Sequence, residues 1–456
     1  MKPASVLTTL VVAGAIAVYF IPAPAGVAQE TMHAAALVLL TVGLWAVGTL
    51  PEHITGFIFF TLAMILAVAP PEVVFSGFAS NTLWLVLGGL VMAVAVQRTG
   101  LARRIAGALF ARFMHSYAQL VAAMVMLAIV LSFLMPATVA RILLLVPIAG
   151  ALSERVGFER GSAGYYGIVL AAIMATYQCG TTVLTANAPN LILAGSAEAL
   201  YHIQISYAEY LWVQLPVLGL LKGSAIVGFV CWLFRAKVRP VAGQETLDPL
   251  TPQQRRMMVI LIVALAMWAT DFLHGIKAGW IAMAAAIVCL LPRVGVMSPA
   301  AFGDVRLGAY FYVAATLGLG LVTQTTGLSQ LLGRMTESAL PLEHDADFLN
   351  FITLSLFSTL VAMLSTNPAQ PAVLGPLAAY FADATGWSLK ATLMTFSIGF
   401  TTFLLPYQVP PVIVGMQIGG VRLATMLRLS LPLALFGVVL MLPLQYVWWL
   451  VIGYFA

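Results

Sequence analysis

The sequence predicts an all-α, polytopic membrane protein with about 11 transmembrane helices and two re-entrant hairpins in two inverted repeats. Three observations predict this fold: the composition, the succession of apolar spans and a repeated order of motifs. Hydrophobic residues make up 62% of the 456 residues and charged residues only 8%, whereas soluble domains carry about 25% charged residues. A chain of this composition lacks the polar residues that a water-facing surface requires.

The apolar spans are recognised by length, because a helix that crosses the hydrocarbon core needs about 20 apolar residues. They fall near residues 5–22, 33–50, 54–70, 80–97, 163–194, 211–234, 257–273, 278–292, 308–324, 388–417 and 425–454. The first span follows Lys2 and precedes IPAPAGVAQE, a pattern that a cleaved signal peptide also shows. We expect it to be a retained first helix.

Two spans, 163–194 and 388–417, are too long for one straight helix. The first is interrupted by CGTTVLTANAPN and the second by LLPYQVPP. Clusters of Gly, Asn and Pro break a helix, and such breaks persist in a membrane only where protein surrounds them or where they line a cavity. We therefore predict two broken helices.

Two further segments, 119–153 and 348–381, are too long for one crossing and short for two. Arg141 is the only charge between Gln119 and Ser153, and STNPAQP lies at the centre of the second segment. Each is predicted to be a re-entrant hairpin, with two short helices that enter and leave on the same side and a polar tip near the midplane.

The basic residues test this topology. With the N-terminus in the cytoplasm and each hairpin returning to its own side, only Lys277, Arg334 and Lys390 of the 21 basic residues lie outside. Arg141 and Lys222 lie within the membrane, and the other basic residues are cytoplasmic. This is the positive-inside pattern, and it predicts a multi-pass protein of the cell membrane. The scattered basic residues form no single face, which argues against nucleic-acid binding.

An internal repeat supports the same arrangement. QRTGLARRIAG (97–107) resembles QTTGLSQLLGR (324–334), and each is followed by a hairpin and then by a broken helix. We assign 1–74 to N-terminal scaffold helices, 75–240 to repeat 1 and 241–456 to repeat 2. Because the hairpins open to opposite sides, the repeats are inverted, which is the architecture of secondary transporters with a midplane site.

The order of hairpin and broken helix, twice, resembles the divalent anion:sodium symporter (DASS) family over about residues 75–455. Family members typically carry Ser-Asn-Thr at each hairpin tip and a Gly-Thr-Pro-Pro-Asn-like turn in each broken helix. Here the turns read NAPN (187–190) and QVPP (408–411), and the tips read Pro136-Ala137-Thr138 and Ser365-Thr366-Asn367. The resemblance implies an elevator-type transporter of C4-dicarboxylates, citrate, tartrate or sulfate, which forms a homodimer through its scaffold.

In the family, the tips and turns hold sodium ions and a substrate carboxylate. The first tip lacks the Ser and Asn oxygens at positions 136 and 137, whereas the second tip keeps oxygen-bearing side chains. Apart from Na⁺, no cofactor is expected. Ser132, Gly180, Ser365 and Asn367 are the candidate sodium ligands.

Arg141 lies one turn beyond Thr138, and no Asp or Glu occurs in either hairpin or at either break. An arginine at the bilayer centre costs roughly 2.5–3.5 kcal/mol on insertion scales, and its fork of donors matches carboxylate or sulfate oxygens. We therefore predict that an anionic substrate neutralises Arg141, which takes over the role of a sodium ion. The alternative is an arginine bonded to backbone carbonyls, which holds the tip together.

Further candidates come from the tips and turns. Gln370 faces Arg141 by the predicted symmetry, or is a hydrogen-bonding tip residue. The polar side chains of the first break line a ligand cavity, or only bond between helices. The predicted substrate-binding residues are Arg141, Thr138, Ala137, Asn187, Pro189, Asn190, Thr366, Asn367, Gln370 and Pro410.

The sequence favours a secondary transporter of a small divalent oxyanion, coupled to sodium or exchanging one anion for another. One alternative is a permease of the same superfamily for another solute such as arsenite, although a neutral substrate leaves Arg141 uncompensated. A membrane-embedded enzyme is disfavoured because no HExxH motif, paired Asp or Ser/His arrangement occurs. The three cysteines lie far apart without metal-ligand spacing.

Overall fold

The computed structural model describes residues 3–113, 115–135, 137–238, 249–337 and 339–455. These residues form helices and no strand. Lys2 and Pro136 lie outside the described residues. Six helical segments of the described part are long and apolar enough to cross a membrane: Gln29–Val47, Asn81–Thr99, Tyr117–Leu134, Tyr207–Leu233, Asp347–Leu364 and Leu423–Val451.

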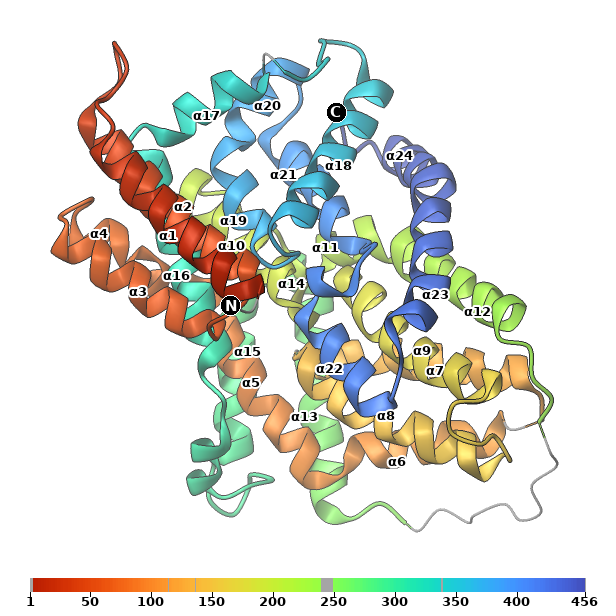
Figure 1. Ribbon diagram of the computed structural model, residues 1–456. Coiled ribbons are helices and arrows are strands. Elements are labelled where there is room, and N and C mark those ends of the chain that lie inside the picture. Colours follow the sequence, from red (N-terminus) through yellow and green to blue (C-terminus); the bar gives the residue numbers. More distant parts are fainter. Residues whose placement is uncertain (1–2, 114, 136, 239–248, 338, 456) are drawn as a thin grey trace.

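The N-terminal quarter begins with a helical pair that lies to one side of the molecule (Figure 1). Its helices are α1 (Pro3–Phe20), α2 (Gln29–Val47), α3 (Glu52–Ile65), α4 (Pro71–Val74), α5 (Asn81–Thr99) and α6 (Leu101–Arg112). Gly48 and Gly100 adopt positive φ angles of 65° and 67° at the ends of α2 and α5, the left-handed conformation that commonly ends a helix. Gly100 therefore separates α5 from α6 within the TGLARRIA motif.

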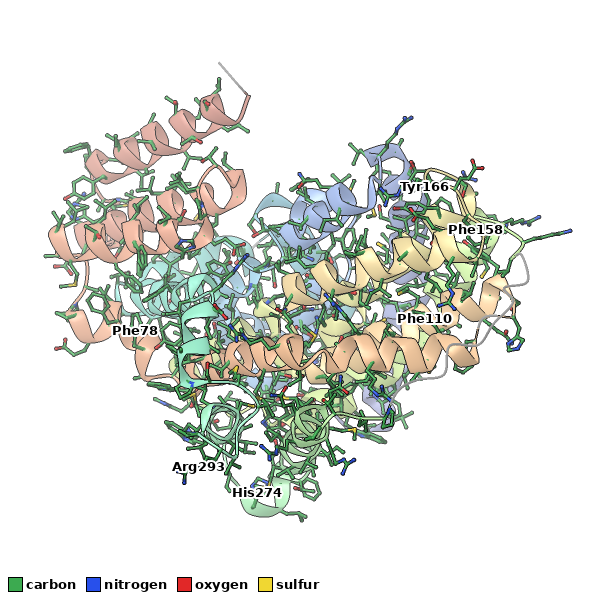
Figure 2. The ribbon with its side chains drawn as sticks, turned by 90° about the horizontal axis from the view of Figure 1, so that it is seen from below. Phe78, Phe110, Phe158, Tyr166, His274 and Arg293 are labelled. Carbon is green, nitrogen blue, oxygen red and sulfur yellow. The ribbon has the colours of Figure 1, made fainter. Side chains whose placement is uncertain are left out.

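The first predicted hairpin is formed by α7 (Tyr117–Leu134) and α8 (Thr138–Arg155). Ser116 caps α7 by accepting a hydrogen bond from the backbone N–H of Gln119 at 3.2 Å. The two helices pack against each other and against α9. Seen from below, Phe110 of α6 lies on the same side of the molecule as Phe158 and Tyr166, which flank the start of α9 (Figure 2).

The first broken helix consists of α9 (Ala163–Gln178), two short 3₁₀ turns (Gly180–Thr182 and Leu184–Ala186) and α10 (Ala188–Tyr201). The break occurs where Asn187 is extended, with φ −135° and ψ 145°, and Pro189 follows within the first turn of α10. The next span is continuous but contains a π-helical segment: α11 (Tyr207–Gln214), η4 (Leu215–Leu221) and α12 (Lys222–Leu233).

The second half starts with α13 (Pro252–Ala269), α14 (Asp271–His274), α15 (Ala278–Leu290), a 3₁₀ turn (Pro299–Asp304), α16 (Gly308–Thr325) and α17 (Leu328–Glu337). Helix α15 packs along α5, and α16 packs along α3. A Cβ on Gly88 of α5 would lie 2.6 Å from the carbonyl carbon of Ala282, so only glycine permits this close approach. Viewed from below, His274 and Arg293, at opposite ends of α15, lie along one edge of the molecule (Figure 2).

The second predicted hairpin is α18 (Asp347–Leu364) followed by a returning arm. That arm is α19 (Gln370–Leu374), a 3₁₀ turn (Gly375–Leu377) and α20 (Ala378–Thr385), rather than one helix. The interruption falls at Gly375 and Pro376, because proline supplies no N–H to the helix ladder. Figure 1 places α18 and α20 toward the opposite end of the molecule from α7 and α8.

The second broken helix consists of α21 (Leu389–Thr401), a 3₁₀ turn (Pro406–Gln408) and α22 (Pro410–Gly419). The last span is α23 (Leu423–Phe436), a π-helical segment (Gly437–Met441) and α24 (Leu442–Val451). The sequence predicts neither π segment. Helices therefore occupy every predicted span, and both predicted breaks are present. The number of membrane crossings and the inverted relation of the halves stay predictions.

The hairpins and broken helices contact one another crosswise. Helix α22 packs against α8, and α10 packs against α19. A Cβ on Gly415 of α22 would lie 3.1 Å from the Cγ2 of Ile142, and one on Gly375 would lie 3.0 Å from the Cβ of Ser196 on α10. The first hairpin thus lies beside α22, the second helix of the second broken helix. The second hairpin lies beside α10, the second helix of the first broken helix.

Candidate functional site

Arg141 lies on the first turn of α8 and is completely buried. Its Nη1 donates to the carbonyl oxygen of Met135 at 3.0 Å. Its Nη2 donates to the carbonyl oxygens of Thr176 at 3.2 Å and Ala186 at 3.0 Å. The guanidinium therefore joins the hairpin tip, the end of α9 and the start of α10, where broken helices leave carbonyl groups without helical partners.

Two polar side chains complete this cluster. The hydroxyl of Thr138 donates to the carbonyl oxygen of Ala186 at 3.2 Å and to Oδ1 of Asn187. Nη2 of Arg141 donates to the same Oδ1 at 3.3 Å. Three of the predicted substrate-binding residues are thus within hydrogen-bonding distance of one another.

The charge of Arg141 has no acidic partner among the described residues. Its acceptors are carbonyl, amide and hydroxyl oxygens, and its Nε has no hydrogen-bond partner. Ion pairs between described residues, such as Lys277–Glu198 and Lys390–Glu209, instead lie at the ends of helices. Carbonyl dipoles solvate a buried cation but leave its net charge uncompensated.

The predicted ligands of a first sodium ion converge on this guanidinium. A Cβ on Gly180 would lie 2.7 Å from Nη2 of Arg141 and 3.3 Å from Oγ of Ser132. The hydroxyl of Ser132 donates to the carbonyl oxygen of Ala128 at 2.9 Å within its own helix. The guanidinium of Arg141 therefore fills the space between Gly180 and Ser132, and the described residues there do not fit a sodium ion beside it.

The second tip is tied to the second broken helix by Asn367. The backbone N–H of Asn367 donates to the carbonyl oxygen of Gln408 at 2.9 Å. Its Nδ2 donates to the carbonyl oxygen of Phe400 at 3.0 Å, and its Oδ1 accepts from Nε2 of Gln408 at 3.4 Å. The hydroxyl of Ser365 donates to the carbonyl oxygen of Val361 at 2.8 Å. Both side chains suggested as sodium ligands are therefore engaged in the protein's own hydrogen bonds.

Tyr177 connects the two tips, and sequence reasoning did not identify it. Its hydroxyl accepts from Nδ2 of Asn367 at 2.8 Å and donates to the carbonyl oxygen of Phe400 at 2.9 Å. Its own carbonyl oxygen accepts from Nδ2 of Asn187 at 3.3 Å. One residue at the end of α9 thus contacts the first turn through its backbone and the second tip through its side chain.

Among the described residues, the side chain of Gln370 makes no hydrogen bond to the Asn367 cluster. Its Nε2 donates to the hydroxyl of Ser358 at 2.7 Å and to the carbonyl oxygen of Phe396 at 3.3 Å. These contacts hold the returning arm of the hairpin to α18 and α21, as expected for a hydrogen-bonding tip residue. Its Oε1 has no partner.

The polar side chains of the first break mostly bond locally. Thr181 and Thr182 donate to the carbonyl oxygens of Gln178 and Cys179 at 2.6 and 2.7 Å. Nδ2 of Asn190 donates to the carbonyl oxygen of Val183 at 2.8 Å, and its Oδ1 is buried without a partner. The break is therefore a hydrogen-bonded turn with one unused acceptor.

A cavity of about 270 Å³ lies beside the first broken helix, away from the tips. Leu184 and Ala194 contribute to its wall, together with Glu198, Asp271 and Lys277. None of the residues predicted to bind substrate lines it.

The remaining predicted residues lie beside these clusters. Ala137 and Pro410 are partly exposed, whereas Pro189 and Thr366 are buried. Together, the first tip with its turn and the second tip with its turn form two polar clusters that Tyr177 joins. Such clusters of polar groups at helix ends can hold an anion between N–H donors and a fixed cation.

Comparison with known proteins decides the family. The family model described as the sodium:sulfate symporter transmembrane region matches residues 3–455. The chain belongs to this family. Its members include the DASS transporters whose motifs the tips and breaks resemble, so the resemblance noted in the sequence is confirmed. The family is one of transporters and not of enzymes.

Several relatives are similar to this chain along most of their length. A membrane protein of Cupriavidus necator is 24% identical, over 97% of this chain and 92% of its own. The L-tartrate/succinate antiporter of Escherichia coli K12 is 24% identical, over 81% of this chain and 78% of its own. An uncharacterized transporter of Haemophilus influenzae is 23% identical, over 91% of each chain.

Two solved structures share the fold. The YdaH transporter of Alcanivorax borkumensis superposes with a TM-score of 0.58 at 14% identity, over 94% of this chain and 99% of its own. MtrF of Neisseria gonorrhoeae superposes with a TM-score of 0.54 at 14% identity, over 98% of this chain and 94% of its own. At this identity the similarity shows the fold alone.

Proposed function

We propose that this protein is a secondary transporter of a small divalent oxyanion of the C4-dicarboxylate class, which it exchanges for another anion. The observation that carries the proposal is Arg141, a fully buried arginine whose hydrogen-bond partners among the described residues are all uncharged oxygens. A transported dianion beside the first tip supplies the missing negative charge. The cost of burying a cation is then offset in the loaded state.

The groups around Arg141 are suited to an anion. Thr138 and Ala137 lie at the start of α8, and Asn187 and Pro189 lie at the start of α10. The N-termini of both helices direct backbone N–H groups and partial positive charge toward the tip. Nε of Arg141 has no partner in the part of the chain that the structure describes, so the guanidinium retains a donor for a carboxylate.

The second cluster supplies the other end of the site. Thr366 and Asn367 at the second tip and Pro410 at the start of α22 lie across Tyr177 from the first cluster. Asn190 and Gln370 each keep an unpartnered buried oxygen. We assign these residues to binding of the uncharged part of the substrate, because hydroxyl groups of tartrate or malate donate to such acceptors.

Movement of the substrate follows the elevator scheme of the DASS family. The two hairpins and two broken helices form a unit through the crosswise contacts of α22 with α8 and of α10 with α19. In the proposed scheme, this unit slides against a scaffold built from the other helices, which also forms a homodimer in the cell membrane. The two halves of the chain are inverted repeats, with the N-terminus in the cytoplasm.

Relatives support a dicarboxylate rather than sulfate. The L-tartrate/succinate antiporters of Escherichia coli and Shigella sonnei are both 24% identical over 81% of this chain. Their names describe exchange of two C4-dianions. An exchange reaction also agrees with the position of Arg141, because a transporter in which arginine fills the first sodium position needs no sodium ion there.

A thermal-shift measurement tests the substrate class. We expect succinate, malate or L-tartrate to raise the melting temperature of the purified protein in a concentration-dependent manner, because a ligand that binds only the folded state stabilises it by RT ln(1 + [L]/Kd). Succinamide, a neutral amide of similar shape, is the matched control and should give no shift. Stabilisation by succinamide, or by sulfate or citrate but by none of the three C4-dicarboxylates, would contradict the proposal.

A further inference from the structure

Lys222 is a second buried cation, and the mechanism derived so far does not use it. It lies at the start of α12 and is 1% exposed. Its Nζ donates to the carbonyl oxygen of Thr401 at 2.8 Å and to the hydroxyl of Thr402 at 2.7 Å. Both acceptors are uncharged, as they are for Arg141.

We propose that Lys222 occupies the cation position of the second broken helix, so that the two fixed cations together replace mobile coupling ions and transport is independent of sodium. This inference rests on the proposed function. Thr401 is the last residue of α21 and Thr402 is its C-cap. Lys222 thus lies where the incoming half of a broken helix ends.

Arg141 occupies the corresponding position in the first broken helix. Its Nη2 donates to the carbonyl oxygen of Thr176, in the last turn of α9. Each incoming half-helix therefore presents a last-turn carbonyl to one buried cationic side chain. This agrees with the partial negative charge and the unpaired carbonyl groups at a helix C-terminus.

The backbone of Lys222 is held at the first break while its side chain reaches the second. A Cβ on the adjacent Gly223 would lie 3.5 Å from Sγ of Cys179, and a Cβ on Gly219 would lie 2.9 Å from Oγ1 of Thr182. The π-helical segment Leu215–Leu221 ends directly before Lys222, and such segments reorient the residues that follow them. Lys222 therefore links the two breaks.

The carbonyl oxygens near the second break are also in use. Phe400 accepts from Asn367 and Tyr177, and Thr401 accepts from Lys222. A sodium ion at this position requires several oxygen ligands, and it would meet the ammonium group of Lys222. The described residues therefore do not fit a sodium ion at the second break, just as Gly180 and Ser132 do not at the first.

The experiment compares sodium with choline. Dianion affinity of the wild type, measured by thermal shift and by binding of radiolabelled succinate, should be the same in both salts. For Lys222→Met we expect succinate affinity to fall on the order of tenfold in choline, because the variant removes a positive charge that attracts the dianion in a site of low effective dielectric. Sodium should recover part of that loss by filling the cleared position.

Two variants control for folding and charge. Lys222→Arg keeps the cation and should behave as the wild type. Lys390→Met removes a lysine from the opposite end of α21, where Lys390 pairs with Glu209 at 3.1 Å, and should change neither affinity nor salt dependence. The inference would be overturned if the wild type bound succinate only in sodium. It would also be overturned if Lys222→Met lost no succinate affinity, or lost the same affinity in sodium as in choline. Absence of any dianion effect on the wild type would instead overturn the proposed function itself.

Discussion

Arg141→Gln is expected to weaken dianion binding strongly and to abolish transport while the protein remains folded. Glutamine keeps a donor for the carbonyl oxygens of the tip but removes the positive charge. Loss of one partner of a buried charged pair costs about 2–5 kcal/mol, so succinate affinity should fall on the order of a hundredfold. Titration of the melting temperature with succinate measures this change, and uptake into proteoliposomes measures the loss of transport.

Two companion variants separate charge from architecture. Arg141→Lys keeps the charge but loses the planar fork that contacts Met135, Thr176 and Ala186. It should retain part of the affinity. Arg334→Gln removes an exposed arginine of α17 and should leave binding unchanged. Undiminished transport by Arg141→Gln would contradict the account and would favour an arginine that only holds the tip.

Gly180→Ala is expected to weaken dianion binding at least tenfold by displacing the guanidinium without altering any charge. The added methyl group would lie 2.7 Å from Nη2 of Arg141 and 3.3 Å from Oγ of Ser132, so the arginine must move. Overpacking a buried site typically costs about 1–3 kcal/mol, and the melting temperature should fall accordingly. The same succinate titration measures both effects.

Gly228→Ala on α12 is the matched control, since a Cβ there meets nothing within 4 Å. Replacement of an exposed helical glycine stabilises by about 0.5–1 kcal/mol. We therefore expect an unchanged or raised melting temperature and unchanged affinity. If folded Gly180→Ala bound succinate as tightly as Gly228→Ala, the position of the guanidinium would be irrelevant to binding.

The helices and breaks could be predicted because they depend on local sequence. Apolar length fixes the spans, and the breaks occur where Asn187 with Pro189, and Pro406 with Pro410, interrupt the helical pattern. The π-helical segments and the divided arm α19–α20 were not predicted. A π-helical segment shifts hydrogen bonds by one residue without a distinctive composition, so packing against neighbours determines where it forms.

The candidate site could be predicted only in part. Arg141, Thr138 and Asn187 were identified because a lone charge and a polar cluster are conspicuous in an apolar chain. Tyr177 was missed, because its position between the tips depends on contacts between residues 190 positions apart. The only available signal was a hydroxyl-bearing aromatic residue two positions before the first break.

The alternative interpretation of Arg141, an arginine bonded to backbone carbonyl groups, describes its contacts in the structure. The sequence left open whether Arg141 meets an anion or backbone carbonyl groups, and the structure places its Nη atoms on three carbonyl oxygens. The two roles are compatible, since carbonyl groups fix the guanidinium while its charge stays available to a substrate. Lys222 contacts the carbonyl oxygen of Thr401 in the same manner.

Exchange of tracer succinate in proteoliposomes tests the central claim most directly. Vesicles that contain unlabelled succinate are compared with empty vesicles, each in sodium and in choline medium. If two fixed cations neutralise a travelling dianion, labelled succinate should enter only the loaded vesicles, at the same rate in both media. Uptake into empty vesicles that requires an inward sodium gradient and ignores internal succinate would contradict the account.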